Sequence, residues 1–113
     1  SVFTKLEEKN RSYNETLALK SLQHLNGEKE VEILQALSKF PEVIQRAANN
    51  YEPHLICYFL RNLASSFHSY YNDEKLLVEG EEELQAKLFM LSAVKQVIFN
   101  GLSLLGISSP KSM

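Results

Sequence analysis

An apolar stripe between Pro53 and Asn72 constrains the fold of this chain more than any other feature. Large apolar side chains recur every four residues, and a second set lies one position further round. The two sets are Leu55, Phe59, Leu63 and Phe67, and Ile56, Leu60 and Ala64. This spacing is that of one face of an α-helix. The segment therefore predicts one long helix whose apolar face lies against a core.

The composition favours helices rather than strands in the rest of the chain. Its 113 residues fit one small domain, and 4 Gly and 3 Pro are too few for a turn-rich β protein. Cys57 is the single cysteine, so no internal disulfide forms, and its apolar surroundings predict a small core residue. No run of about 18 apolar residues and no signal-peptide pattern occurs, so we expect a soluble, cytoplasmic protein.

Further helices are predicted at residues 28–40, 41–51 and 81–105, and a loop with a short helical turn at residues 12–27. Acidic first turns and Pro41 mark the helix starts. Gly101 inside the last helix predicts close packing of another backbone, and Gly106 is expected to end that helix. The residues expected to face the core are Val31, Leu34, Leu37 and Phe40; Val43, Ile44 and Ala47; and Leu84, Leu88, Leu91, Val94, Ile98, Leu102 and Leu105. The fold class is therefore all-α, an antiparallel bundle of about five helices.

The charge is distributed unevenly along the chain. The net charge of −2 argues against nucleic acid, but residues 53–72 and 84–113 contain no Asp or Glu. The four basic residues of these two segments are Arg61, Lys87, Lys95 and Lys111. Two interpretations remain open: a mildly positive face that attracts an anion, or helices that are simply buried.

An aromatic cluster lies on the predicted helix at residues 53–72, with Tyr71 at its C-terminal end. Tyr58, His68, Tyr70 and Tyr71 lie on this acid-free segment. They are either core and rim aromatics or a platform for unstacked RNA bases, for which stacking contributes roughly 1–3 kcal/mol per base. The residues alone leave both RNA and a protein partner open.

Catalytic and metal-binding motifs are not apparent in the sequence. His24, His54 and His68 are scattered, and Cys57 has no second cysteine beside it. Neither a glycine-rich phosphate loop nor a G-x-S-x-G turn occurs. We therefore expect no catalytic residues and no metal site in this chain.

Three segments together carry a family resemblance. The first is Phe40-Pro-Glu-Val-Ile44 with Ala47-Ala48, and the second is Glu52-Pro-His54 followed by Tyr58-Phe59-Leu60, Leu63-Ala64, Phe67 and Tyr70-Tyr71-Asn72. The third runs from Asn100-Gly-Leu-Ser-Leu-Leu-Gly-Ile107 through Pro110 to Met113. In this order and spacing they resemble the C-terminal, DALR-type anticodon-binding domain of arginyl-tRNA synthetase. The resemblance covers roughly residues 28–113, and the first 27 residues match poorly.

The resemblance implies a helical bundle of the class I synthetase type that binds the anticodon loop of arginine tRNA. Residues 1–113 would form a single domain, truncated at its N-terminal side, because the family's Tyr-Ala-His-Ala-Arg-like segment is expected before Ser1. The chain itself would be no enzyme and hold no cofactor. Its full-length parent would be an arginine–tRNA ligase that uses ATP and magnesium. The implied partners are arginine tRNA and an upstream catalytic domain, with neither DNA nor a membrane.

The resemblance also implies site residues. Tyr71 and the terminal Met113 would lie at the anticodon loop, with Tyr70 supporting Tyr71. Three basic residues would attract phosphates: Lys87, Arg61 and Lys95. Lys87 stands where the family usually has Arg, which keeps the charge but loses bidentate geometry. The alternative is a helical protein-interaction module without RNA binding, whose exposed apolar surface docks a partner helix.

Overall fold

The computed structural model describes residues 7–9, 11–73 and 78–108, and it is helical throughout, with no strand among these residues. The elements are α2 (Glu15–Lys20), the 3-10 helix η1 (Leu22–His24), α3 (Glu28–Ser38), α4 (Phe40–Asn49), α5 (His54–Asp73) and α6 (Glu81–Ser108). The all-α prediction and the positions of the long helices are confirmed. Met113 and Lys111 lie outside the described residues.

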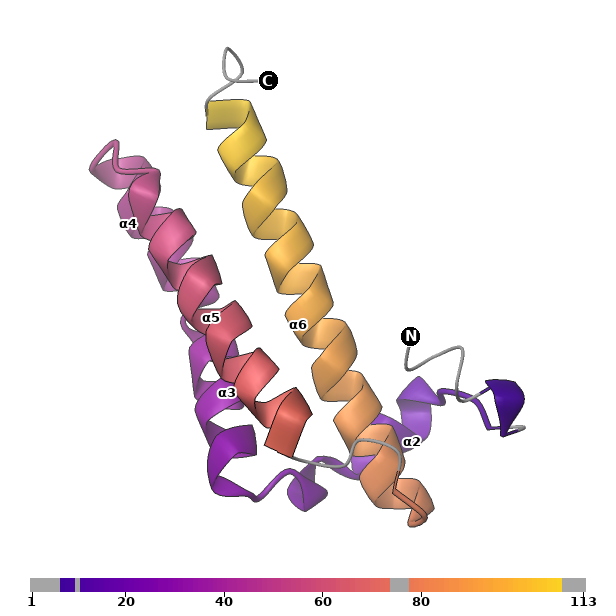
Figure 1. Ribbon diagram of the computed structural model, residues 1–113. Helices are drawn as coiled ribbons and strands as arrows, with labels where there is room; N and C mark the ends of the chain where they lie inside the picture. Colours follow the sequence, from indigo (N-terminus) through magenta and orange to yellow (C-terminus); the bar gives the residue numbers. More distant parts are fainter. Residues whose placement is uncertain (1–6, 10, 74–77, 109–113) are drawn as a thin grey trace.

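Two long antiparallel helices form the frame of the domain (Figure 1). α5 runs back along α3 and α4, and α6 then runs in the opposite direction beside α5. α2 lies across the first part of α6. Glu81, Glu82 and Glu83 stabilise the start of α6, where the helix dipole is positive. The side chain of Asn14 caps α2 by accepting a 3.1 Å hydrogen bond from the Leu17 N–H.

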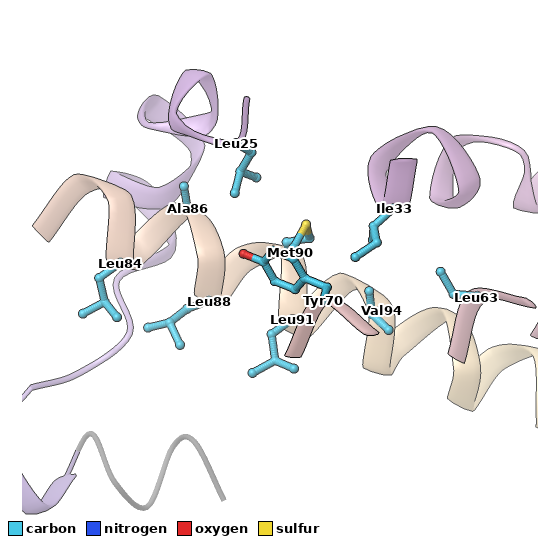
Figure 2. Close-up of a cluster of buried hydrophobic side chains, with 10 residues drawn as sticks. All are labelled: Leu25, Ile33, Leu63, Tyr70, Leu84, Ala86, Leu88, Met90, Leu91 and Val94. Carbon is cyan, nitrogen blue, oxygen red and sulfur yellow. The ribbon is translucent and has the colours of Figure 1, made fainter. Parts of the chain in front are cut away.

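The main core lies where the last half of α5 meets α3 and the first half of α6 (Figure 2). It consists of Leu25, Ile33, Leu63, Tyr70, Leu84, Ala86, Leu88, Met90, Leu91 and Val94. A smaller cluster of Ala47, Ile56 and Leu60 joins α4 to the first half of α5. Each large apolar side chain buried in this way contributes about 1.5–3 kcal/mol. The main core thus holds the second half of α5, and the smaller cluster holds its first half.

Some side chains face differently from the prediction. Val31 is exposed, and Ile33 is fully buried in its place. The reason is Glu30, which lies in the interior and shares a helix face with Ile33. Leu102 is 57% exposed, because no described element covers that side of α6. Cys57 is exposed as well, so the prediction of a core cysteine is wrong: Ile56 and Leu60 define the buried side of α5.

The predictions for the two glycines of α6 have different outcomes. A Cβ atom added at Gly101 would lie 2.7 Å from both terminal carbons of Leu60. Close packing at Gly101 is thus confirmed, although a side chain and not a backbone approaches it. Gly106 does not end the helix, because α6 continues to Ser108.

α6 is also long and apolar enough, between Glu81 and Gly106, to cross a membrane by length and composition. This corrects the expectation that no segment meets that criterion. One such helix is weak evidence for a membrane span, since core helices of folded domains pass the same test. Here α6 supplies the core residues from Leu84 to Val94 and packs against α2, α3 and α5.

Candidate nucleic-acid interface

Tyr71 is the one site residue from the sequence that the structure presents as a half-exposed aromatic ring. The residue is 42% exposed, and its ring is tilted by 50° against that of Phe67, with 6.1 Å between ring centroids. Phe67 is one helical turn earlier on α5, so the pair follows directly from helix geometry. An aromatic ring that is supported on one side and open on the other is suited to stack on an unpaired base.

Tyr70 points into the protein. It is fully buried in the middle of the main core (Figure 2). Its hydroxyl donates a 2.6 Å hydrogen bond to Glu30 Oε2. Its ring centroid lies 6.3 Å from that of Phe67, on which Tyr71 also rests. Tyr70 therefore has no surface for a ligand, and any support it gives to Tyr71 passes through the protein interior.

Lys87 is buried too, which corrects the expectation that it faces phosphates. The residue is 4% exposed, and its Nζ lies 3.5 Å from Glu30 Oε2 and 3.7 Å from Glu83 Oε1. The same Nζ is 5.7 Å from the centroid of the Tyr70 ring. The buried carboxylate of Glu30 and the exposed carboxylate of Glu83 thus already balance the ammonium charge.

Arg61 and Lys95 are exposed but lie away from Tyr71. Arg61 is ten residues before Tyr71 on the same helix, which corresponds to about 15 Å along its axis. Lys95 is eight residues beyond Lys87 on α6, about 12 Å along that helix. The structure therefore gathers Tyr71, Tyr70 and Lys87 at one end of α5, and it does not bring Arg61 or Lys95 to this end.

Other polar residues at this end of α5 were not predicted. Lys29 of α3 donates a 3.3 Å hydrogen bond to Ser69 Oγ, which places a cation beside the last turns of α5. Asn72 Nδ2 lies 3.2 Å from His68 Nε2 on the exposed side of the same turns. We call Lys29, His68, Ser69, Tyr71 and Asn72 the α5-end surface. No sequence signal marks Lys29, because its contact joins residues 40 positions apart.

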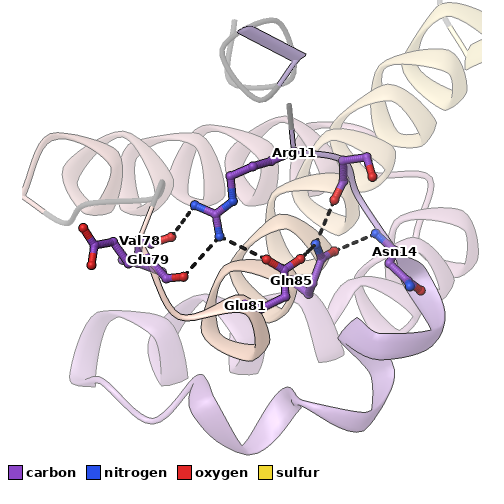
Figure 3. Close-up of polar contacts among 7 residues, drawn as sticks. Arg11, Asn14, Val78, Glu79, Glu81 and Gln85 are labelled. Carbon is purple, nitrogen blue, oxygen red and sulfur yellow. Dashed lines mark hydrogen bonds and ion pairs between the residues drawn. The ribbon is translucent and has the colours of Figure 1, made fainter. Parts of the chain in front are cut away.

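A second polar cluster secures the segment before α2 (Figure 3). Arg11 donates hydrogen bonds to the carbonyls of Val78 and Glu79 and to Glu81 Oε2, at 2.8, 3.3 and 3.1 Å. Gln85 donates to the Ser12 carbonyl and to Glu81 Oε1, both at 2.8 Å. The hydrogen bond from Gln85 and then that from Arg11 lower the pKa of Glu81. Arg11 is thus engaged in holding the fold.

Two further observations concern other kinds of binding site, an apolar groove and a metal site. An apolar groove of about 400 Å³ lies at the opposite end of α5 from Tyr71, and its lining residues are Ile44, Ala47, Ala48, Tyr51, Pro53, Ile56 and Leu104. Within the part of the chain that the structure describes, no group of three His, Cys, Asp or Glu could hold a metal ion.

The fold and the α5-end surface define a small helical binding domain. Its described residues form no metal cluster. A comparison with protein-family models matches the DALR anticodon binding domain over residues 1–113. The chain belongs to this family. The match includes the first 27 residues. It therefore corrects the sequence-based expectation that the family resemblance covers only residues 28–113 or so.

Curated relatives agree with the family. An arginine–tRNA ligase of Coxiella burnetii (strain CbuK_Q154) is 42% identical over all 113 residues of this chain. One of Legionella pneumophila (strain Corby) is likewise 42% identical over the whole chain, and one of Geobacter metallireducens is 46% identical over 89 residues, or 79% of it. The chain spans 19% of the length of the first two relatives and matches 16% of the third. No solved structure matches this chain.

Proposed function

We propose that this chain binds the anticodon loop of arginine tRNA as one domain of an arginine–tRNA ligase. A catalytic domain elsewhere in the longer protein would use ATP and magnesium to aminoacylate the bound tRNA, and this chain would not itself be an enzyme. The observation that carries the proposal is the half-exposed ring of Tyr71 on the α5-end surface of a DALR domain. We expect the protein to work in the cytoplasm, with neither DNA nor a membrane as a partner.

Each residue has a distinct role in this proposal. Tyr71 stacks on an unpaired anticodon base, and Met113, which lies outside the described residues, contacts the anticodon loop beside it. Lys29, which donates a hydrogen bond to Ser69 in the last turns of α5, attracts loop phosphates. Arg61 and Lys95 attract phosphates further along the RNA. These phosphate contacts make binding weaken steeply as the salt concentration rises, because condensed counterions are released from the RNA.

Substitution of Tyr71 tests the proposal. Loss of one base stack, roughly 1–3 kcal/mol, predicts that Tyr71→Ala weakens arginine-tRNA binding by about 5- to 150-fold. Tyr58→Ala is the matched control, because Tyr58 is an exposed tyrosine near the other end of α5. Binding is measured by titration, with helix content checked by circular dichroism. Equal affinity of Tyr71→Ala and the wild-type chain would refute the proposed role.

A second candidate is a helical protein-interaction module. It is favoured by two exposed apolar side chains on α6, Phe99 at 66% and Leu102 at 57%. Such a surface would dock a partner helix by its apolar area, so binding would change little with salt. Salt discriminates the two candidates: tRNA binding that falls steeply as the salt concentration rises favours the anticodon-loop proposal. A chain that stays monomeric in sedimentation at rising concentration counts against self-association through this surface.

A further inference from the structure

One buried carboxylate joins three helices next to Tyr71. Glu30 lies in the first turn of α3, where its Oε1 accepts a 3.1 Å hydrogen bond from the Gly27 N–H. Its Oε2 accepts the 2.6 Å hydrogen bond from Tyr70 of α5, and Lys87 Nζ of α6 lies 3.5 Å from the same oxygen. We call Glu30, Tyr70 and Lys87 the buried triad. It connects the start of α3, the end of α5 and the second turn of α6.

The triad has little contact with solvent. Glu30 is 6%, Lys87 4% and Tyr70 0% exposed. Among the described residues, every buried side-chain nitrogen and oxygen has a hydrogen-bond partner. Apolar residues of similar volume often stabilise such an interior equally well, so a buried ion pair is weak evidence for a stability role. Its directional bonds do, however, select one arrangement of the three helices.

The arrangement that it selects determines where Tyr71 lies. α5 ends at Asp73, so Tyr70 and Tyr71 belong to its last turn, the part of a helix that frays first. The hydroxyl of Tyr70 attaches this turn to α3. Phe67 contacts the rings of both Tyr70 and Tyr71, so the buried ring and the exposed ring share one support.

We propose that Glu30, Tyr70 and Lys87 are positioning residues that hold Tyr71 in its RNA-binding orientation before RNA arrives. This inference rests on the proposed function, in which Tyr71 is the contact residue. A preorganised last turn does not have to be ordered during binding, and ordering one residue corresponds to about a tenfold loss of affinity. The triad lies inside the domain, so its loss should leave the number of phosphate contacts unchanged.

Tyr70→Phe is the test variant, because it removes the hydroxyl and keeps the ring in the core. The matched control is Tyr58→Phe, which removes the hydroxyl of an exposed tyrosine on the same helix. In the unbound chain, we expect Tyr70→Phe to speed backbone hydrogen exchange of residues 71–73 about tenfold, with α4 unaffected. Arginine-tRNA affinity should fall about tenfold, with an unchanged slope of log K against log salt.

A pair of substitutions at Lys87 provides the rescue test. Lys87→Arg keeps a cation next to Glu30 and should retain both slow exchange and RNA affinity. Lys87→Met leaves the Glu30 carboxylate without this cation and should weaken RNA binding at least as much as Tyr70→Phe, with faster exchange that extends beyond residues 71–73 because the whole domain is destabilised. If Lys87→Met fails to fold, Tyr70→Phe and Lys87→Arg still test the proposal.

The outcomes separate the positioning role from the proposed function. Unchanged exchange at residues 71–73 in Tyr70→Phe would overturn the positioning role, and so would faster exchange throughout the domain, which is the sign of a general stability effect. Faster local exchange with unchanged RNA affinity, while Tyr71→Ala weakens binding, would also overturn it. If Tyr71→Ala itself leaves binding unchanged, the proposed function fails and the positioning inference fails with it.

Discussion

Gly101 offers a prediction whose sign depends on the packing of α5 against α6. Replacing glycine by alanine inside an exposed helix stabilises it by about 1 kcal/mol. At Gly101, however, the new methyl group would lie 2.7 Å from Leu60 Cδ1 and Cδ2 and 3.1 Å from its Cγ. Carbon atoms pack favourably at about 3.5–4.0 Å, so the two helices must separate or Leu60 must leave its rotamer.

The magnitude follows from these two opposing effects. Overpacking a filled core costs typically about 1–3 kcal/mol, and an off-rotamer side chain adds about 0.5–1.5 kcal/mol. Leu60 is buried, so its side chain has little space into which to move. After the helix-propensity gain is subtracted, Gly101→Ala should lower the free energy of unfolding by about 0.5–3.5 kcal/mol. A domain of this size then loses about 2–15 °C in melting temperature.

The assay is thermal and urea unfolding followed by circular dichroism. A double-mutant cycle with Leu60→Ala isolates the contact, because the truncated side chain leaves room for the methyl group that Gly101→Ala introduces. The double variant should be more stable than the sum of the two single effects predicts. An increase in stability for Gly101→Ala alone, as at an exposed helix position, would refute the close packing of Leu60 on α6.

Three further predictions concern the interior, the polar cluster and the surface. Lys87→Met should lower the free energy of unfolding by about 3–5 kcal/mol in urea titrations, since it leaves Glu30 buried without its cation. The pKa of Glu81 is lowered in the folded chain, so its stabilising effect is present above the ordinary glutamate pKa and is lost as the pH falls through the folded value. Stability should therefore fall more steeply with acid in the wild-type chain than in Glu81→Gln, measured as unfolding midpoints across that range. Cys57 is exposed, so a thiol reagent should modify it in the native chain at nearly the rate seen in denaturant, and strong protection would contradict its placement.

The sequence could predict the long helices because their apolar periodicity is local information. Leu55 to Phe67 and Leu84 to Val94 repeat at three and four positions, and both segments are helices in the structure. Which face of α3 is buried could not be predicted in this way. It depends on Glu30 meeting Tyr70 and Lys87, which are 40 and 57 positions away, and hydrophobicity alone places a glutamate outside.

The structure separates the candidate site residues by their burial, which the sequence could not do. Tyr70 and Tyr71 are adjacent and identical in type, yet one is fully buried and the other is 42% exposed. Adjacent helix positions point about 100° apart, so a helix end that contacts the core through one tyrosine presents the next one to solvent. Lys87 looked like a surface cation because lysines are rarely buried, and only its paired carboxylates explain the exception.

The most direct test of the central claim is a thermodynamic cycle between Tyr71 and the anticodon bases. Wild-type chain and Tyr71→Ala are each titrated with intact arginine tRNA and with the same tRNA made abasic at the anticodon nucleotides. Tyr71→Ala and the removal of the bases each cause a loss of binding free energy. If Tyr71 stacks on one of these bases, the two losses overlap, and we predict a coupling free energy of about 1–3 kcal/mol. If the two losses simply add, Tyr71 contacts no anticodon base, which would contradict the account.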